Sequence, residues 1–159
     1  MNAVETLKAA RAAGIRLGID GDALTLEAPA APPPALLDLL LRHKVGVVAL
    51  LRPANDGWAA DDWLAFFEVR AAGIAGLPRT EAEARAFSCC VVEWLNRNPA
   101  RSPAGRCLGC GNADHAYDPL LPFGTESSGH AWLHSRCWQA WHSARKADAI
   151  AALAAMGID

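Results

Sequence analysis

The chain has 159 residues, of which 52% are hydrophobic, and a formal net charge of −2. This composition lacks the low hydrophobicity and high net charge of disordered chains, and its charge gives no global basic field of the kind that indicates nucleic-acid binding. No segment approaches the roughly 20 consecutive apolar residues of a membrane span, and the first residues lack the apolar region of a signal peptide. We therefore expect a cytoplasmic protein with no membrane partner.

Residues 1–53 are predicted to form a helix, a β-hairpin and two further helices. Asn2 and Glu5 have the spacing of a capping box at the start of the first helix. The segment Asp20-Gly21-Asp22 is a strong signal for a tight hairpin turn. On either side of this turn, apolar residues alternate as in half-buried strands, at Leu17, Ile19, Leu24 and Leu26.

The stretches LKAARAAGIRLGIDGDALTLEAP and LLDLLLRHKVGVVALLR resemble the N-terminal docking domain of the TubC type, which begins some nonribosomal peptide synthetase subunits. Gly14, the hairpin turn and the His43-Lys44 junction carry the likeness. The resemblance implies a module that dimerises and offers its hairpin to a short helix of an upstream protein. Short strands also leave edges that a partner can extend, so the predicted partner-binding residues are Leu17, Ile19, Leu24 and Leu26.

The middle of the chain is predicted to form a pair of helices. Asp61 or Asp62 is the expected N-cap of the first helix, and Thr80 with Glu83 has the capping-box spacing for the second. We expect this pair to pack on the C-terminal part of the chain, so that residues 58–159 form one domain.

Cysteine and histidine concentrate in the last third of the sequence. Cys107 and Cys110 form a C-x2-C pair, and His134 and Cys137 form an H-x2-C pair further along. In a reducing compartment such cysteines favour metal binding over disulfides. Thiolate and imidazole suit Zn²⁺, and four of them close a tetrahedral structural site. The sequence therefore predicts one structural zinc ion bound by these four residues.

The predicted elements around these ligands have the order of a treble-clef zinc finger. CLGCG reads as a zinc knuckle, residues 116–123 and 130–133 as two strands joined by a turn at GTESSG, and His134 as the start of a helix. Residues three apart on a helix share one face, which favours His134 as the partner of the last cysteine. His130 and His115 remain alternative ligands.

A second resemblance concerns residues 58–159. The stretches AEARAF, CCVVEWLNRNP, GRCLGCG, PLLPFGTE and HAWLHSRCWQAWH are similar to an uncharacterised zinc-containing family of alphaproteobacteria that is associated with prophages. This likeness implies that the gene lies in or near a mobile element, and it implies no particular activity.

The predicted fold is α+β and mostly helical. A docking-like module spans residues 1–53, and a helical pair plus a zinc finger spans residues 58–159, with the zinc-binding part at 105–159. The predicted function is that of a non-catalytic zinc-binding adaptor with a protein partner, and a homodimer through the N-terminal module is one arrangement that the resemblance implies.

Two other functions stay open at this stage. A DNA-associated accessory protein of a mobile element would contact phosphates through Arg97, Arg101 and Arg106. A nuclease of the His-Asn-His type is more distant, because four ligands leave no open metal position and no suitable Asn follows His115.

Overall fold

The computed structural model describes residues 1–124 and 129–159, and the contacts between these residues divide the chain into two units. The first unit comprises Met1–Cys90 together with Ala152–Asp159, and the second comprises Val91–Ala151. This division differs from the predicted domain boundary at residues 54–57, and the predicted domains stay predictions. The mixture of helices with two small sheets agrees with the predicted α+β class.

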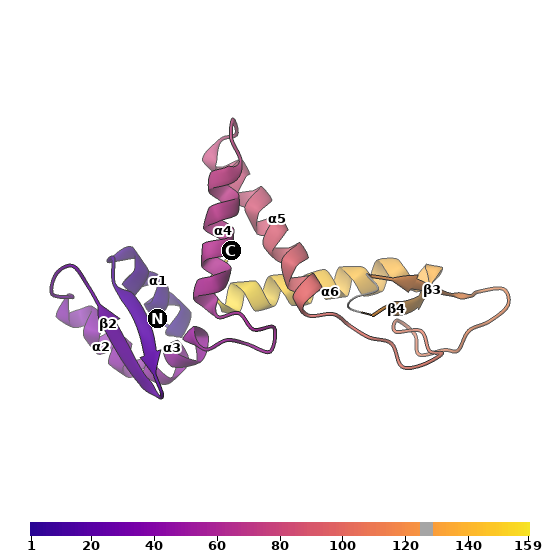
Figure 1. The fold of residues 1–159 in the computed structure, drawn as a ribbon, viewed down its shortest axis with the longest axis horizontal. Helices are drawn as coiled ribbons and strands as arrows, with labels where there is room; N and C mark the ends of the chain where they lie inside the picture. Colours follow the sequence, from indigo (N-terminus) through magenta and orange to yellow (C-terminus); the bar gives the residue numbers. More distant parts are fainter. Residues whose placement is uncertain (125–128) are drawn as a thin grey trace. The chain divides into compact units, whose positions relative to one another are not determined.

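The elements follow one another along the chain as Figure 1 shows. In the first unit they are α1 (Ala3–Ala12), β1 (Arg16–Asp20), β2 (Ala23–Glu27), α2 (Pro34–Arg42), α3 (Lys44–Leu51) and α4 (Ala60–Gly73). Two helices, α5 (Arg79–Arg97) and α6 (Ser135–Ala155), have residues in both units. The second unit also contains β3 (Leu120–Phe123) and β4 (Ala131–His134).

The N-terminal elements form in the predicted order. The capping box is present, because the Asn2 side chain accepts a hydrogen bond from the Glu5 N–H at 2.9 Å and the Glu5 carboxylate accepts one from the Asn2 N–H at 2.7 Å. Strands β1 and β2 pair antiparallel, and Arg52 after α3 donates a hydrogen bond to the Gly21 carbonyl in the hairpin turn at 3.1 Å. Side chains from α1, α2, α3, the start of α4 and the link between α1 and β1 share one core, at Leu7, Ala10, Ile15, Leu36, Leu40, Val47, Leu51 and Ala60.

Helices α1 and α3 approach each other closely at Gly46, where an added Cβ would lie 2.6 Å from the Ala3 Cβ. Such a separation forces the two backbones apart, so we expect Gly46→Ala to lower the free energy of unfolding by about 1–3 kcal/mol in urea denaturation. Gly73→Ala is the matched control, because an added Cβ there meets nothing within 4 Å. Equal effects of the two substitutions would show that the approach at Gly46 is not a constraint.

The start of α4 differs from the prediction. The helix begins at Ala60 with Ala59 as its N-cap, so neither Asp61 nor Asp62 occupies the cap position. The Asp62 carboxylate instead accepts a hydrogen bond from the Ala59 N–H at 2.8 Å. An acidic residue at this third helical position supplies the reciprocal half of a capping box, which the sequence does not distinguish from an N-cap.

The start of α5 also differs. The helix begins at Arg79, because the Pro78 carbonyl accepts a hydrogen bond from the Ala82 N–H at 3.0 Å, and Thr80 therefore lies inside the first turn. Glu83 pairs with Arg79 at 2.7 Å instead of closing a capping box with Thr80.

In the second unit, β3 and β4 pair antiparallel, with Leu121 opposite Leu133. The predicted strand at residues 116–123 is shorter than expected, because a turn takes its first part. The Asp118 N–H donates to the His115 carbonyl at 3.0 Å in this turn. The predicted turn at GTESSG falls largely on residues 125–128, which lie outside the described residues. Among the helices described, none combines the length and the hydropathy that crossing a membrane requires.

Candidate metal centre

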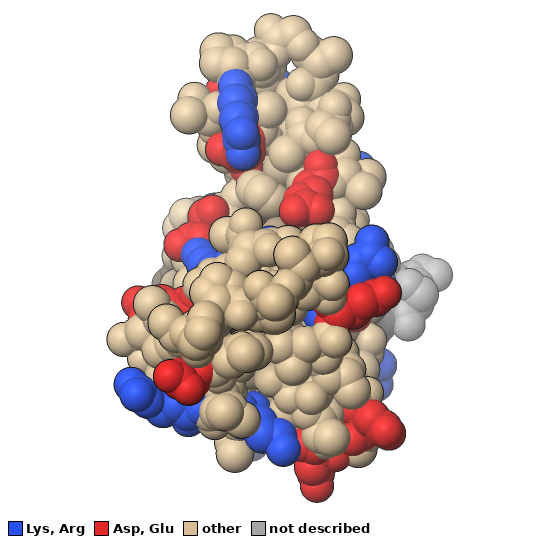
Figure 2. Space-filling model, turned by 90° about the vertical axis from the view of Figure 1, so that its left-hand side faces the viewer, with Lys and Arg blue, Asp and Glu red and all other residues tan. Residues whose placement is uncertain are grey.

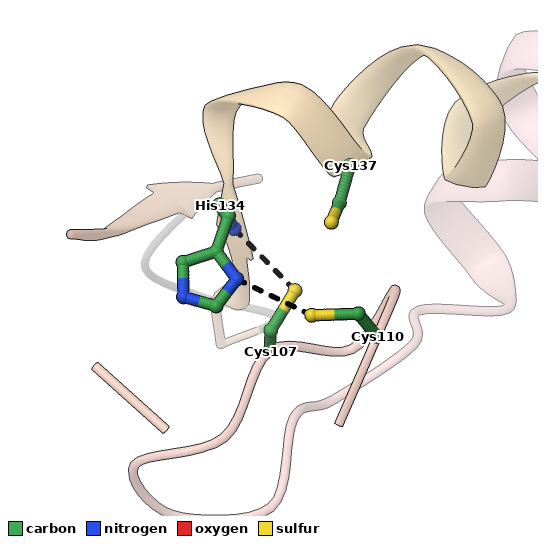
Figure 3. Close-up of side chains that lie close together, drawn as sticks. All are labelled: Cys107, Cys110, His134 and Cys137. Atoms are coloured by element: carbon green, nitrogen blue, oxygen red, sulfur yellow. Dashed lines mark hydrogen bonds between the residues drawn. The ribbon is translucent and has the colours of Figure 1, made fainter. Parts of the chain in front are cut away.

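The first ligand pair lies on a tight turn. The Gly111 N–H donates to the Cys107 carbonyl at 2.8 Å, and the Cys107 N–H donates to the Asn112 carbonyl at 2.8 Å. These bonds fold the segment back on itself, so that the side chains of Cys107 and Cys110 extend toward the same point (Figure 3). Cys107 is buried and Cys110 is exposed.

The second pair lies where β4 runs into α6. His134 is the last residue of β4 and is 1% exposed, and Cys137 belongs to the first turn of α6. The prediction placed His134 inside the helix, whereas it ends the strand directly before it. The three-residue spacing still brings both side chains toward the knuckle (Figure 3).

The four predicted ligands converge. Their ligand atoms, three Sγ and one imidazole nitrogen, all lie within 4.8 Å of one another. The Cys110 Sγ is 3.4 Å from the His134 Nδ1. With Zn–S of about 2.3 Å and Zn–N of about 2.0 Å, the ligand atoms of a tetrahedral zinc site lie roughly 3.5–3.8 Å apart. The arrangement is therefore compatible with one metal ion after a small contraction of the widest pair.

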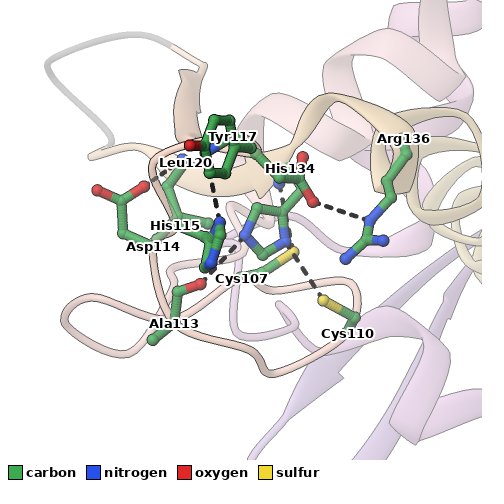
Figure 4. Close-up of polar contacts among 10 residues, drawn as sticks. Cys107, Cys110, Ala113, Asp114, His115, Tyr117, Leu120, His134 and Arg136 are labelled. Atoms are coloured by element: carbon green, nitrogen blue, oxygen red, sulfur yellow. Dashed lines mark hydrogen bonds and ion pairs between the residues drawn. The ribbon is translucent and has the colours of Figure 1, made fainter.

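The orientation of the His134 ring favours metal binding. Its Nε2 lies 3.2 Å from the Ala113 carbonyl oxygen, which can only accept a hydrogen bond (Figure 4). In the neutral ring the proton therefore belongs on Nε2, and the Nδ1 lone pair points toward the cysteine sulfurs. Histidine ligands of metals commonly donate their second N–H to a carbonyl in this way. Sequence reasoning missed Ala113, because a backbone acceptor leaves no signal in the residue type.

The two alternative histidines lie outside this group of four. The His115 Nδ1 accepts a hydrogen bond from the Tyr117 N–H at 3.3 Å (Figure 4). The His130 ring stands edge-to-face against Trp132, with the ring centroids 5.9 Å apart.

Gly109 allows the knuckle to reach α6. A Cβ at this position would lie 2.8 Å from the Cys137 Cβ and 3.3 Å from the Leu133 Cδ2. The residues packed around this contact form a small core, whose buried members are Cys107, Ala131 and Leu133. The knuckle backbone therefore approaches the proposed ligand Cys137 at a glycine that has no room for a side chain.

Without a cation, the three thiols do not ionise together. Burial raises the pKa of the Cys107 thiol, but backbone N–H groups, led by that of His134, outweigh it and lower the pKa to about 6. The Asn112 N–H lowers the pKa of Cys110. Burial, followed by the two neighbouring thiols, raises the pKa of Cys137 to about 11. A bound divalent cation reverses the Cys137 shift, since a coordinating thiol is deprotonated.

These shifts predict proton release on metal binding. With a pKa of about 11, Cys137 holds its proton at neutral pH and must lose it to become a ligand. Zinc and protons then compete, so the apparent zinc affinity should rise with pH, by up to about tenfold per unit for each proton released. Calorimetric titration at pH 7.5 in phosphate and in Tris, whose ionisation enthalpies differ, should give at least about one proton per zinc ion. A zinc affinity that is constant from pH 6.5 to 8.5 would contradict this expectation.

The predicted partner-binding residues lie on the β1–β2 hairpin. Leu17 pairs with Leu26 and Ile19 pairs with Leu24 across the strands. Three of these side chains, those of Leu17, Ile19 and Leu24, are half-buried against the core of their own module. Leu26 is 42% exposed. The role of the four residues in partner binding stays a prediction, and Leu26 is the one that offers a large apolar surface to solvent.

The likeness to TubC-type docking domains and to a prophage-associated family also stays a prediction. In comparisons with known proteins, no family model, no curated protein and no solved structure matches this chain.

Proposed function

We propose that this chain binds one structural Zn²⁺ ion through Cys107, Cys110, His134 and Cys137, in a treble-clef-like finger. The observation that carries the proposal is the convergence of these ligand atoms within 4.8 Å of one another. Three thiolates and an imidazole favour zinc over calcium or magnesium, which prefer oxygen ligands. Four protein ligands also fill a tetrahedral site, and a catalytic zinc ion needs an open position for water or substrate. We therefore propose a non-catalytic role for the metal.

The small core around the site supports a structural role for the metal. The buried residues of this core are Cys107, Ala131 and Leu133, and two of them are small. A core of this size contributes little hydrophobic free energy. Zinc binding supplies the missing free energy, because the ligands do not converge in an unfolded chain.

Removal of the metal tests the structural role. After treatment of the full chain with a strong chelator, amide hydrogens of β3, β4 and the knuckle should lose their protection from exchange with deuterium. Amides of α1, α2 and α3 should keep it, since these helices pack on a separate core. Unchanged protection throughout the chain would show that the metal has no structural role.

We further propose that the chain is a protein–protein adaptor and that its hairpin contacts the partner. Two features support this. Strand β2 belongs to a two-stranded sheet and presents Leu26 to solvent, and an unpaired strand edge can accept another strand. On the face shown in Figure 2, basic and acidic side chains lie beside one another in small mixed groups with uncharged surface between the groups, which suits a contact that is not dominated by one sign of charge.

Substitution of Leu26 tests the adaptor role. Leu26→Lys should remove the captured partners when the tagged chain is purified from its native host, because a charge would replace the apolar contact. Val69→Lys is the matched control: Val69 is 71% exposed on α4 and lies away from the hairpin sequence. A change at Leu24 would be a poorer test, since its side chain packs on the core of the module. Identical sets of partners for wild type and Leu26→Lys would contradict the proposal.

A DNA-associated role has less support. Arg97 pairs with Glu93 at 2.7 Å, and Arg106 donates to the Gly111 carbonyl at 3.2 Å, so each guanidinium group uses part of its hydrogen-bonding capacity within the chain. Salt dependence separates the two functions. Binding through phosphate contacts weakens steeply as salt rises from 50 to 200 mM, whereas apolar docking at the hairpin changes little.

A further inference from the structure

The second unit contains a cavity that the metal centre does not use. Its volume is about 560 Å³, and its described walls come from the end of α5 with the two residues Pro99 and Ala100, from Phe123, Gly124, Gly129 and Ala131 in and beside β3 and β4, and from α6. Cavities of roughly 300–1,000 Å³ are typical of small-molecule sites, in which apolar walls surround a few polar groups. All of the lining residues belong to the second unit.

Aromatic rings form one wall. The Phe123 and Trp138 rings stack with centroids 4.3 Å apart and planes 10° apart, and Trp138 stacks in turn on His142 at 4.6 Å and 15°. Trp141 adds a further ring, 5.8 Å from that of Trp138. These side chains are only half-buried. The wall is thus a group of ordered, half-buried aromatic side chains on which an apolar ring can pack.

Arg145 is the only charged side chain among the described residues that line the cavity. It is held in place, because it donates to the Asn98 carbonyl at 2.5 Å and its guanidinium carbon lies 5.1 Å from the centre of the Trp94 ring. A second hydrogen bond reaches the exposed Asp148 at 3.3 Å. A guanidinium has five N–H donors, and those of Arg145 that have no partner among the described residues can bind an anion. A fixed arginine in an apolar cavity suits a carboxylate, which it can bind by two parallel hydrogen bonds.

We propose that this cavity binds a planar aromatic carboxylate, with the ring system against the aromatic wall and the carboxylate on Arg145. Arg145 would bind the carboxylate of such a ligand, and the apolar lining would contact its ring system. A neutral ring would leave Arg145 without a partner from the ligand, and a small anion would leave the apolar lining without contacts. Trp138 directly follows the proposed metal ligand Cys137, and its side chain packs on the same small core. The aromatic wall therefore adjoins the proposed metal centre through this core.

A matched pair of probes tests the proposal. The zinc-loaded full chain is titrated with 2-naphthoate and with its neutral amide, 2-naphthamide, by calorimetry and by saturation-transfer NMR. The acid should bind about tenfold more tightly than the amide, as expected for one charge-assisted contact. Arg145→Gln should remove this difference while zinc content and helical signal stay unchanged. Failure of both probes to bind, or equal affinity for the two, would overturn the proposal.

A second variant, Val92→Glu, tests the same site independently if Arg145→Gln does not fold. Val92 lines the cavity on α5 and is 58% exposed, so a polar residue is tolerated there. Val92→Glu should weaken 2-naphthoate binding about tenfold, because it adds a negative charge at the site, and should affect 2-naphthamide much less. Ile150→Glu is the control, since Ile150 is 45% exposed on α6 and does not line the cavity. Equal effects of the two glutamates would place the probe elsewhere on the protein.

Discussion

Replacing Cys107 by serine is expected to remove the bound zinc and to unfold the part of the chain that surrounds it. Cys107 is 2% exposed, its Sγ accepts a hydrogen bond from the His134 N–H at 3.4 Å, and it is part of the small core. A serine oxygen is a poor zinc ligand and leaves a polar group in an apolar position. Zinc content measured by inductively coupled plasma mass spectrometry should fall from about one ion per chain to below about 0.1.

The matched control is Cys89→Ser. Cys89 lies on α5, is half-buried and is not among the four converging residues. This variant should keep a full complement of zinc and nearly all of its stability. Loss of stability in Cys107→Ser should be several kcal/mol, because structural zinc sites contribute on the order of 10 kcal/mol to folding. If Cys107→Ser retained its zinc, or if Cys89→Ser lost it, the proposed ligand set would be wrong.

Gly109→Ala is expected to weaken zinc binding by about a hundredfold, although it alters no ligand. The new Cβ would lie 2.8 Å from the Cys137 Cβ, a distance that forces the knuckle away from α6. The sulfurs of Cys110 and Cys137 would then separate, and outer residues that orient ligands typically change metal affinity 10- to 100-fold. Competition with a chromogenic zinc chelator measures the effect.

Asn112→Ala is the control for this substitution. Asn112 belongs to the same turn and is exposed. The Cys107 N–H donates a hydrogen bond to the main-chain carbonyl of Asn112, and alanine has the same carbonyl. Its zinc affinity should stay within about threefold of wild type. An affinity of Gly109→Ala equal to that of Asn112→Ala would mean that close approach at position 109 does not shape the site.

The cluster of candidate ligands could be predicted because two short sequence motifs specify it. The C-x2-C and H-x2-C pairs each place two donors on one turn, and the residue types indicate the metal. The supporting contacts are non-local and involve the backbone, as with the Ala113 carbonyl, so no residue type indicates them. The choice of His134 over His130 and His115 followed from helical spacing, yet His134 lies at the end of a strand. The spacing argument gave the four residues whose ligand atoms converge, and the junction of β4 with α6 provides the geometry.

The elements were predictable to a similar extent. Alternation around the Gly21 turn locates the hairpin, but it does not show which side chains face solvent, and three of its four leucine and isoleucine side chains pack on the core of their module. The helix starts at Ala60 and Arg79 were missed for one reason: Asp62 and Thr80 suit both a cap and the first turn, and the surrounding backbone decides between these positions.

The cavity was not predicted at all. Trp138 and His142 are four apart on a helix, so a contact between them was foreseeable. The participation of Phe123 from a strand and of Arg145 depends on how α5, the hairpin and α6 pack within the second unit. Such packing is a property of the folded chain and is not contained in any one segment.

X-ray absorption at the zinc edge, on full-length protein purified without added metal, tests the central claim most directly. We expect one zinc ion per chain, with three sulfur neighbours at about 2.3 Å and one nitrogen neighbour at about 2.0 Å. A sample without zinc would contradict the proposed metal centre, as would a first coordination shell made mainly of oxygen.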